Sequence, residues 1–275
     1  MNRRDFVLGN ATNLAVGVVG TLGVSQLLGC VKSPSGGADP NASASASGAP
    51  AAAACPPVDP DLGSAHLSFA QNGEDLVLRQ AVCDTAATPK PEYMDIGAWD
   101  PINGNNTYYF YRLGCRGVLV EPNPVLGDKL AKVRSGDKLV RAGIRGQGYP
   151  AEADYFMIAD SQLNTFDKDV AKNYKVEKVV KMPLLDINQV MADNFKTPPA
   201  LLSLDAEGMD LTILKSLDWV KWRPKVIIAE AWTGKNGYDF DADIMAYMAA
   251  QNFTFHGGSM VNAVWVDSVL LKKKT

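Results

Sequence analysis

Short apolar segments alternate with amphipathic segments from about residue 71 to residue 266, and this alternation constrains the fold more than any other feature. The apolar segments are rich in Val, Ile and Leu, as strands buried on both faces of a sheet are. Successive strand, helix and strand units joined by short turns form right-handed crossovers and therefore a parallel sheet. We predict an α/β fold with a doubly wound, mostly parallel, seven-stranded sheet and an antiparallel terminal strand.

The same patterns predict the individual elements. Strands are expected at residues 92–98, 117–121, 138–144, 200–205, 225–231, 253–256 and 263–266, and helices at 71–83, 106–113, 124–134, 186–195, 211–217 and 241–251. The last two strands are expected to form a hairpin. In the first helix, Asp75 and Arg79 lie one turn apart, where they are expected to form a pair. The stretch between residues 145 and 185 is less regular.

The N-terminal segment has the features of an export signal. Arg3 and Arg4 precede a weakly apolar, glycine-containing stretch at 14–29 that ends at Cys30. This resembles a twin-arginine signal followed by a bacterial lipobox, in which Cys30 is acylated after cleavage. The alternative, a membrane-spanning anchor, needs about 20 strongly apolar residues. We expect export by the twin-arginine machinery and a lipid anchor in the cell envelope, on the periplasmic side or extracellular face. An unused signal would leave the protein in the cytoplasm.

The composition changes after this segment. Residues 31–63 are mostly Ala, Ser, Gly and Pro, with too little large apolar surface to offset the entropy of ordering. Such a tether would let a lipid-anchored domain stand off a membrane. We therefore divide the chain into a signal segment at 1–30, a tether at 31–63 and one catalytic-sized domain at 64–275.

Charge and cysteine content exclude some classes of partner and site. The formal net charge of −3 provides no basic field for a phosphate backbone, so no nucleic acid partner is expected. Cys55, Cys83 and Cys115 lack the CxxC or histidine spacing of a metal site. A bridge between Cys83 and Cys115 is conceivable after export, but twin-arginine cargo folds in the reducing cytosol, so the fold should not depend on it.

Two features mark a ligand site, because ligands of doubly wound sheets bind beyond the carboxyl ends of the strands. The turn at 95–98 follows the first strand, and its Gly97 lets the backbone approach a ligand closely. Glu121 closes the next strand, where an acid accepts ribose hydroxyls. The sequence lacks the three-glycine fingerprint that cradles a diphosphate. Adenosine without a diphosphate is therefore favoured, and a nicotinamide-dependent oxidoreductase ranks last.

Five motifs, in matching order and spacing, resemble the FkbM family of methyltransferases over about residues 68–230. They are FAQNGEDL at 69–76, DIGA at 95–98, NNTY at 105–108, EPNP at 121–124 and LDAEG at 204–208. The resemblance implies a Rossmann-like class I methyltransferase fold that binds S-adenosyl-L-methionine. It also implies O-methylation of a hydroxyl on a sugar, glycan or natural product. The cofactor-binding residues that it implies are Asp95, Gly97 and Ala98 for the methionine moiety, Glu121 for the ribose, and Ala142 and Gly143 for the adenine.

By the same resemblance, Asp205 and Glu207 line the reaction cavity. Methyl transfer from a sulfonium requires alignment of the acceptor and removal of its proton. We expect one of these two acids to be the base, with Asp100 a lesser candidate. Alternatively, they cap the helix that starts near Asp210. Asp205, Glu207 and Glu230 offer ligands that suit magnesium, but the spacing does not require a metal and none is predicted.

Two functions are consistent with these features. The first is an O-methyltransferase acting on an envelope glycan or similar hydroxyl compound. Because its cofactor is made in the cytosol, it would act before translocation or be exported with cofactor bound. The second is an exported lipoprotein that uses the fold as a non-catalytic glycan- or nucleoside-binding module, which the signal and the altered loop at 99–101 favour. Trp99 and Trp232 are expected near the ligand, and His256 is expected to be packed or on the surface.

Overall fold

A computed structural model describes residues 66–85, 89–233 and 239–271. The predicted signal, with Arg3, Arg4 and Cys30, and the predicted tether lie outside the described residues. Within the described ranges, no helix has the length and apolar character needed to cross a membrane.

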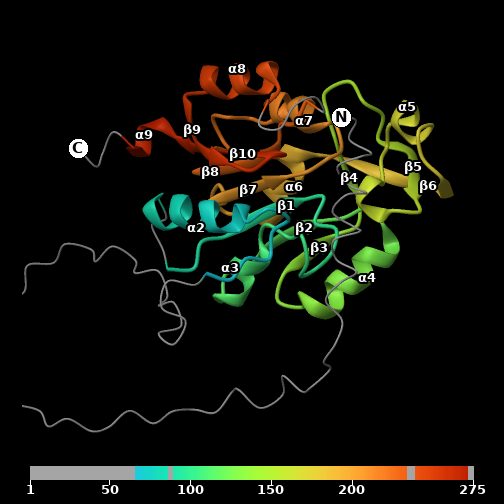
Figure 1. The fold of residues 1–275 in the computed structure, drawn as a ribbon, viewed down its shortest axis with the longest axis horizontal. Coiled ribbons are helices and arrows are strands. Elements are labelled where there is room, and N and C mark those ends of the chain that lie inside the picture. The colour runs from blue at the N-terminus through green and yellow to red at the C-terminus, as the bar shows by residue number, and fades with distance from the viewer. Residues whose placement is uncertain (1–65, 86–88, 234–238, 272–275) are drawn as a thin grey trace, which may run out of the picture. The chain divides into compact units, whose positions relative to one another are not determined.

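Seven strands of the described residues form the central sheet (Figure 1). The first five strands in spatial order are parallel, and β10 is antiparallel to both of its neighbours. The strand order reverses between β1 and β7, which is where a doubly wound sheet binds ligands. The predicted fold class is confirmed. In spatial order the strands are β3 (Lys138–Val140), β2 (Gly117–Val120), β1 (Tyr93–Ile96), β7 (Leu201–Leu204), β8 (Val226–Glu230), β10 (Asn262–Asp267) and β9 (Phe253–Gly258).

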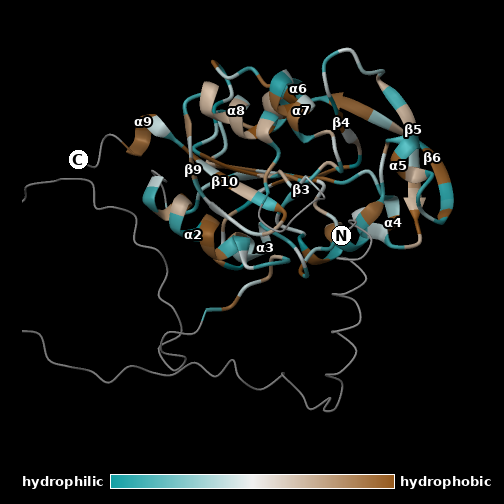
Figure 2. Ribbon diagram, turned by 45° about the horizontal axis from the view of Figure 1, so that its top comes forward, coloured by the Kyte–Doolittle hydropathy of each residue, from teal (hydrophilic) through white to brown (hydrophobic). Residues whose placement is uncertain are grey.

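Helices cover both faces of the sheet (Figure 1). Because side chains alternate along a strand, β1 contributes to an apolar core on each face. Tyr93 belongs to the same core as Leu78, whereas Met94 belongs to the core that contains Ile213. Figure 2 shows the apolar strands in brown between the helices. One face carries α2 (Glu74–Thr85), α3 (Tyr108–Arg112) and α4 (Pro124–Val133), the other α6 (Ile187–Asn194), α7 (Asp210–Ser216) and α8 (Ala242–Ala250), and α9 (Ser268–Leu271) follows β10.

The predicted strand at 138–144 is divided between two sheets. Its first half is β3 of the central sheet, and its second half is β4 (Gly143–Arg145), which pairs with β6 (Val176–Asp186). The strand β5 (Glu152–Ile158) pairs with the other edge of β6 in antiparallel fashion. We call residues 143–186 the insertion. It also holds the 3₁₀ helix η2 (Ser161–Leu163) and α5 (Lys168–Ala171).

The predicted pair between Asp75 and Arg79 is wrong. The helix starts at Glu74 rather than at residue 71, so Asp75 lies in its first turn and is buried. Its carboxylate accepts hydrogen bonds from the Ser68 hydroxyl and from the Phe69 N–H (2.6 Å). Arg79 instead lies over the Tyr109 ring, 5.8 Å from the centroid.

The conceivable bridge between Cys83 and Cys115 is also not formed. Cys115 is a free thiol with 2% of its surface exposed. It belongs to the apolar core between the sheet and α2, so it acts as a small apolar side chain.

Candidate active site

Two turns beyond the switch point of the sheet fit closely against each other. Asp205, just after β7, donates its N–H to the Ile96 carbonyl (3.0 Å). Gly97 has a φ of +77°, and a Cβ atom placed on it would lie 1.9 Å from the Asp205 carbonyl oxygen. Glycine is therefore required at position 97, both for the backbone angle and for the close approach of the two turns. The predicted glycine turn and the predicted Asp205 are brought together here.

Glu121 lies beyond β2, beside this turn, with 3% of its surface exposed. Its carboxylate accepts hydrogen bonds from the N–H groups of Asn123 (2.7 Å) and Trp99 (2.9 Å). Burial raises the pKa of Glu121 to about 7, although the two N–H donors lower it. Trp99 has a φ of +49°, a strained angle for a large side chain, in the loop that bonds Glu121. The two predicted cofactor-binding segments are thus physically connected.

Asp95 is directed inward, although the resemblance assigns it to cofactor binding. With 3% of its surface exposed, it accepts a hydrogen bond from the Thr107 hydroxyl (2.6 Å). Burial raises its pKa, while hydrogen bonds from Thr107 and Ser203 and the charge of Arg134 lower it. Its evident task is to fix the 98–107 loop, and a direct contact with cofactor stays a prediction.

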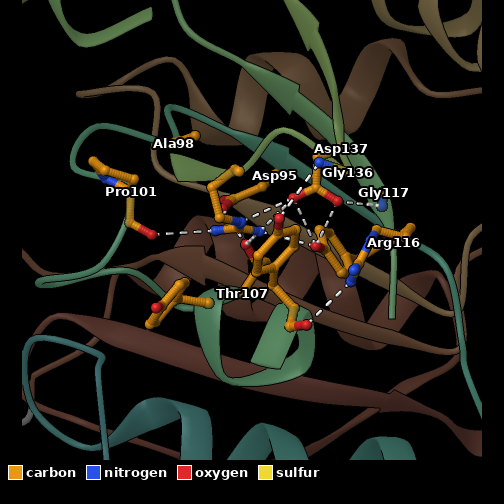
Figure 3. Close-up of polar contacts among 12 residues, drawn as sticks. Asp95, Ala98, Pro101, Thr107, Arg116, Gly117, Gly136 and Asp137 are labelled. Atoms are coloured by element: carbon orange, nitrogen blue, oxygen red, sulfur yellow. Dashed lines mark hydrogen bonds and ion pairs between the residues drawn. The ribbon is translucent and has the colours of Figure 1, made fainter. Parts of the chain in front are cut away.

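Arg134, which follows the last residue of α4, is the centre of a polar network that holds this loop. It is 1% exposed and pairs with Asp137 (2.8 Å). The guanidinium also donates to the Tyr93 hydroxyl (2.9 Å), the Thr107 hydroxyl (3.1 Å) and the Asn105 side-chain oxygen (3.1 Å). Figure 3 shows Asp95, Thr107, Pro101 and Asp137 meeting at this network from separate segments.

Asn105 connects this network to the turn that contains Gly97. The Nδ2 group of Asn105 donates to the carbonyls of Ala98 (2.8 Å) and Asp100 (3.0 Å). Asp100 uses its own carboxylate to accept the N–H groups of Ile102 and Asn103, which closes the loop. Arg134 was missed by sequence reasoning, because an arginine at the end of an amphipathic helix has the pattern of a surface residue.

Four carboxylates gather on the other side of the switch point. Carboxylate oxygens of Asp205, Glu207 and Glu230 lie within 4.8 Å of one another. Asp210, in the first turn of α7, has 4% of its surface exposed. Burial raises its pKa well above the usual range, and the charges of Glu230 and Asp205 raise it further. We call these four residues the acidic cluster.

The alternative interpretation, in which Asp205 and Glu207 cap α7, stays a prediction. The N-cap position of α7 is Met209, which makes no side-chain capping bond. Glu207 has a φ of +51° and lies in the turn before the helix. The role of Asp205 or Glu207 as the base also stays a prediction. The three converging carboxylates have the oxygen chemistry of a magnesium site, but the structure leaves the prediction of no metal untested.

The remaining predicted residues lie at or near the same edge. Ala142 lies between β3 and β4, Gly143 begins β4, and both are buried; the Glu121 N–H donates to the carbonyl of Val140 at the end of β3 (3.0 Å). Trp232 follows β8, and His256 is exposed on β9 as expected. The expectation that Trp232 touches a ligand is untested.

A Rossmann-like sheet with a glycine turn beyond β1, a buried acid beyond β2 and acids beyond β7 has the architecture of a methyltransferase. The family described as "Methyltransferase FkbM domain" matches residues 95–255, more than half of the chain. The protein belongs to this family, as the five motifs predict. Comparison with curated proteins found no match.

Proposed function

We propose that this protein is an S-adenosyl-L-methionine-dependent methyltransferase that methylates a hydroxyl oxygen on a sugar, glycan or natural product. The observation that carries the proposal is the contact between the Gly97 turn and the Asp205 turn, with Glu121 alongside. This contact brings a site for a nucleoside and a set of carboxylates to one edge of the sheet.

The residues of the site suit this cofactor. An acid with a pKa near 7 that is held by two N–H groups retains acceptor capacity for the two hydroxyls of a ribose. The Gly97 turn lies where the methionine portion is expected, and the residues at the end of β3 lie where the adenine is expected. When bound, the cofactor supplies a methyl group on a positively charged sulfur.

The acidic cluster suits removal of a proton from the acceptor. A hydroxyl is a weak nucleophile, and a carboxylate within hydrogen-bond reach takes its proton as the oxygen attacks. Asp205 and Glu207 are partly buried, and their carboxylate oxygens lie within 4.8 Å of each other and of a Glu230 carboxylate oxygen. The local negative charge also favours a positively charged sulfur over a neutral one.

We further propose that the protein acts in the cell envelope, as a lipid-anchored protein exported by the twin-arginine machinery. The support is the pair Arg3 and Arg4 with Cys30 in the sequence. Replacing both arginines by lysine should move the protein from the envelope fraction to the cytosol. Cys30→Ser should leave export intact but release the protein from the membrane. An unchanged distribution in both variants would contradict the proposal.

Transfer of a labelled methyl group tests the activity. The full-length chain is incubated with S-adenosyl-L-methionine labelled in the methyl carbon and an envelope glycan fraction, and label in the glycan is counted after base treatment, which ethers survive and methyl esters do not. Asp205→Asn and Glu207→Gln should lower the rate at least 100-fold for whichever residue is the base. Cofactor binding without any transfer would support the binding-module alternative instead.

A further inference from the structure

The insertion covers the edge of the sheet where the cofactor is proposed to bind. The Trp99 indole N–H donates to the Ser161 hydroxyl of η2 (3.0 Å). Phe166 lies against Gly143, where a Cβ atom would come 2.5 Å from the ring. The insertion is therefore fixed to the first loop and to the end of β3 at once.

Tyr155 of β5 packs against Phe166 of the insertion, near Glu121 and Glu207. Its ring is 4.7 Å from the Phe166 ring and its side chain is 4% exposed. Burial raises the pKa of its hydroxyl, and the charges of Glu121 and Glu207 raise it further. The hydroxyl thus lies within the electrostatic field of both acids.

Asn164 lies beside Tyr155, between η2 and Phe166. Its Oδ1 accepts the Ile158 N–H (2.8 Å), and the residue is 7% exposed. The side chain also faces the Tyr155 hydroxyl and partly offsets the rise in its pKa. Among the described residues, however, the buried Nδ2 has no hydrogen-bond partner of normal geometry. Burying a donor without an acceptor lowers stability, so such a group calls for an explanation.

We propose that the insertion forms the adenine-binding wall of the site, with Asn164 Nδ2 donating to a ring nitrogen and Phe166 packing on the base. This inference rests on the proposed function, because it assigns two further residues to the same cofactor. Adenine has ring nitrogens that can accept a hydrogen bond from Asn164 Nδ2, and an aromatic face that can pack on the Phe166 ring beside Tyr155. Phe166 is partly exposed and lies against Gly143, so its ring stands at the end of β3.

Calorimetric titration of the full-length chain with S-adenosylhomocysteine, and separately with adenosine, tests the assignment. Asn164→Asp keeps an oxygen for the Ile158 N–H and removes the Nδ2 donor. Phe166→Leu keeps an apolar side chain and removes the aromatic face. Asn173→Asp is the matched control, because Asn173 lies in the same insertion and its Nδ2 donates to the Asp169 carbonyl at the surface.

Asn164→Asp and Phe166→Leu should each weaken both ligands roughly threefold to tenfold, whereas Asn173→Asp should change neither. Equal losses of affinity for adenosine and for S-adenosylhomocysteine would mean that both side chains contact the nucleoside part of the ligand. If Asn164→Asp fails to fold, Phe166→Leu still decides the case. Wild-type affinity in the folded variants overturns the assignment while leaving the proposed function standing. If the wild-type chain binds neither ligand, the proposed function fails first.

Discussion

Buried charged groups are arranged differently on the two sides of the switch point, in the Arg134 network and in the acidic cluster. On the β2 side, Arg134 pairs with Asp137 and donates to neighbouring oxygens, so charge and hydrogen-bond donors are balanced. On the β8 side, burial and the charges of Glu230 and Asp205 raise the pKa of Asp210, and carboxylate oxygens of Asp205, Glu207 and Glu230 lie within 4.8 Å of one another. The first region therefore acts as a scaffold, whereas the second gathers acids around a buried carboxyl group with a raised pKa, as sites that bind cations or move protons do.

Arg134→Met should have the largest effect on stability. Removing one partner of a buried ion pair leaves Asp137 uncompensated, and we expect a loss of about 3–5 kcal/mol in the free energy of unfolding. Urea denaturation measures it. Arg141→Met is the control, because Arg141 pairs with Asp128 at the surface and should lose no more than about 1 kcal/mol. Similar losses of unfolding free energy in Arg134→Met and Arg141→Met would contradict the scaffold role of Arg134.

Gly97→Ala should have the second largest effect on stability, because the Gly97 turn packs against the Asp205 turn. The left-handed backbone and the clash with the Asp205 carbonyl should together cost about 2–4 kcal/mol. Gly148→Ala separates the two causes, since Gly148 has a φ of +83° with nothing within 4 Å of its Cβ position. It should lose about 1–2 kcal/mol. Equal losses at the two positions would mean that the close approach has no energetic importance.

Cofactor affinity should depend on pH through Glu121. Its pKa in the unliganded protein is about 7, and ribose hydroxyls need the carboxylate as acceptor. Affinity for S-adenosylhomocysteine should therefore fall about tenfold per pH unit below 7 and level off above it. Glu121→Gln should bind more weakly at pH 8 and show no such slope. A wild-type affinity that is constant between pH 6 and pH 8 would contradict this role.

The smallest effect should come from Asp210→Asn, with a sign opposite to that of Arg134→Met. A folded-state pKa raised above the unfolded value stabilises the protein only at low pH, and that stability is lost as pH rises through the folded pKa. Asparagine removes this loss, so the variant should be about 1 kcal/mol more stable than wild type at pH 8. The difference should shrink by pH 5 in urea denaturation. Destabilisation at pH 8 would contradict the raised pKa of Asp210.

The central strands and the Gly97 turn were predictable because their signals are local. An apolar run such as Val226–Glu230 is buried along its length, and its sequence shows it directly. The insertion was not predictable, because many residues of β5 and β6 are exposed or half-buried. Their apolar and polar residues follow no clean alternation, and their pairing depends on contacts distant in sequence.

Within the site, residue types were predictable and their partners were not. Glu121 was predicted from its place after a strand and Asp205 from the family resemblance, and the topology brings the two turns to one edge of the sheet. Arg134 became part of the site only through the fold, because its acceptors come from β1, the 98–107 loop and the turn at Asp137.

Binding of S-adenosylhomocysteine to the full-length chain, measured by calorimetry at pH 8, tests the central claim most directly. The account predicts one ligand per chain, with affinity at least tenfold weaker in Glu121→Gln because a charge-assisted acceptor is lost. No heat of binding at millimolar ligand would contradict it, as would unchanged affinity in Glu121→Gln.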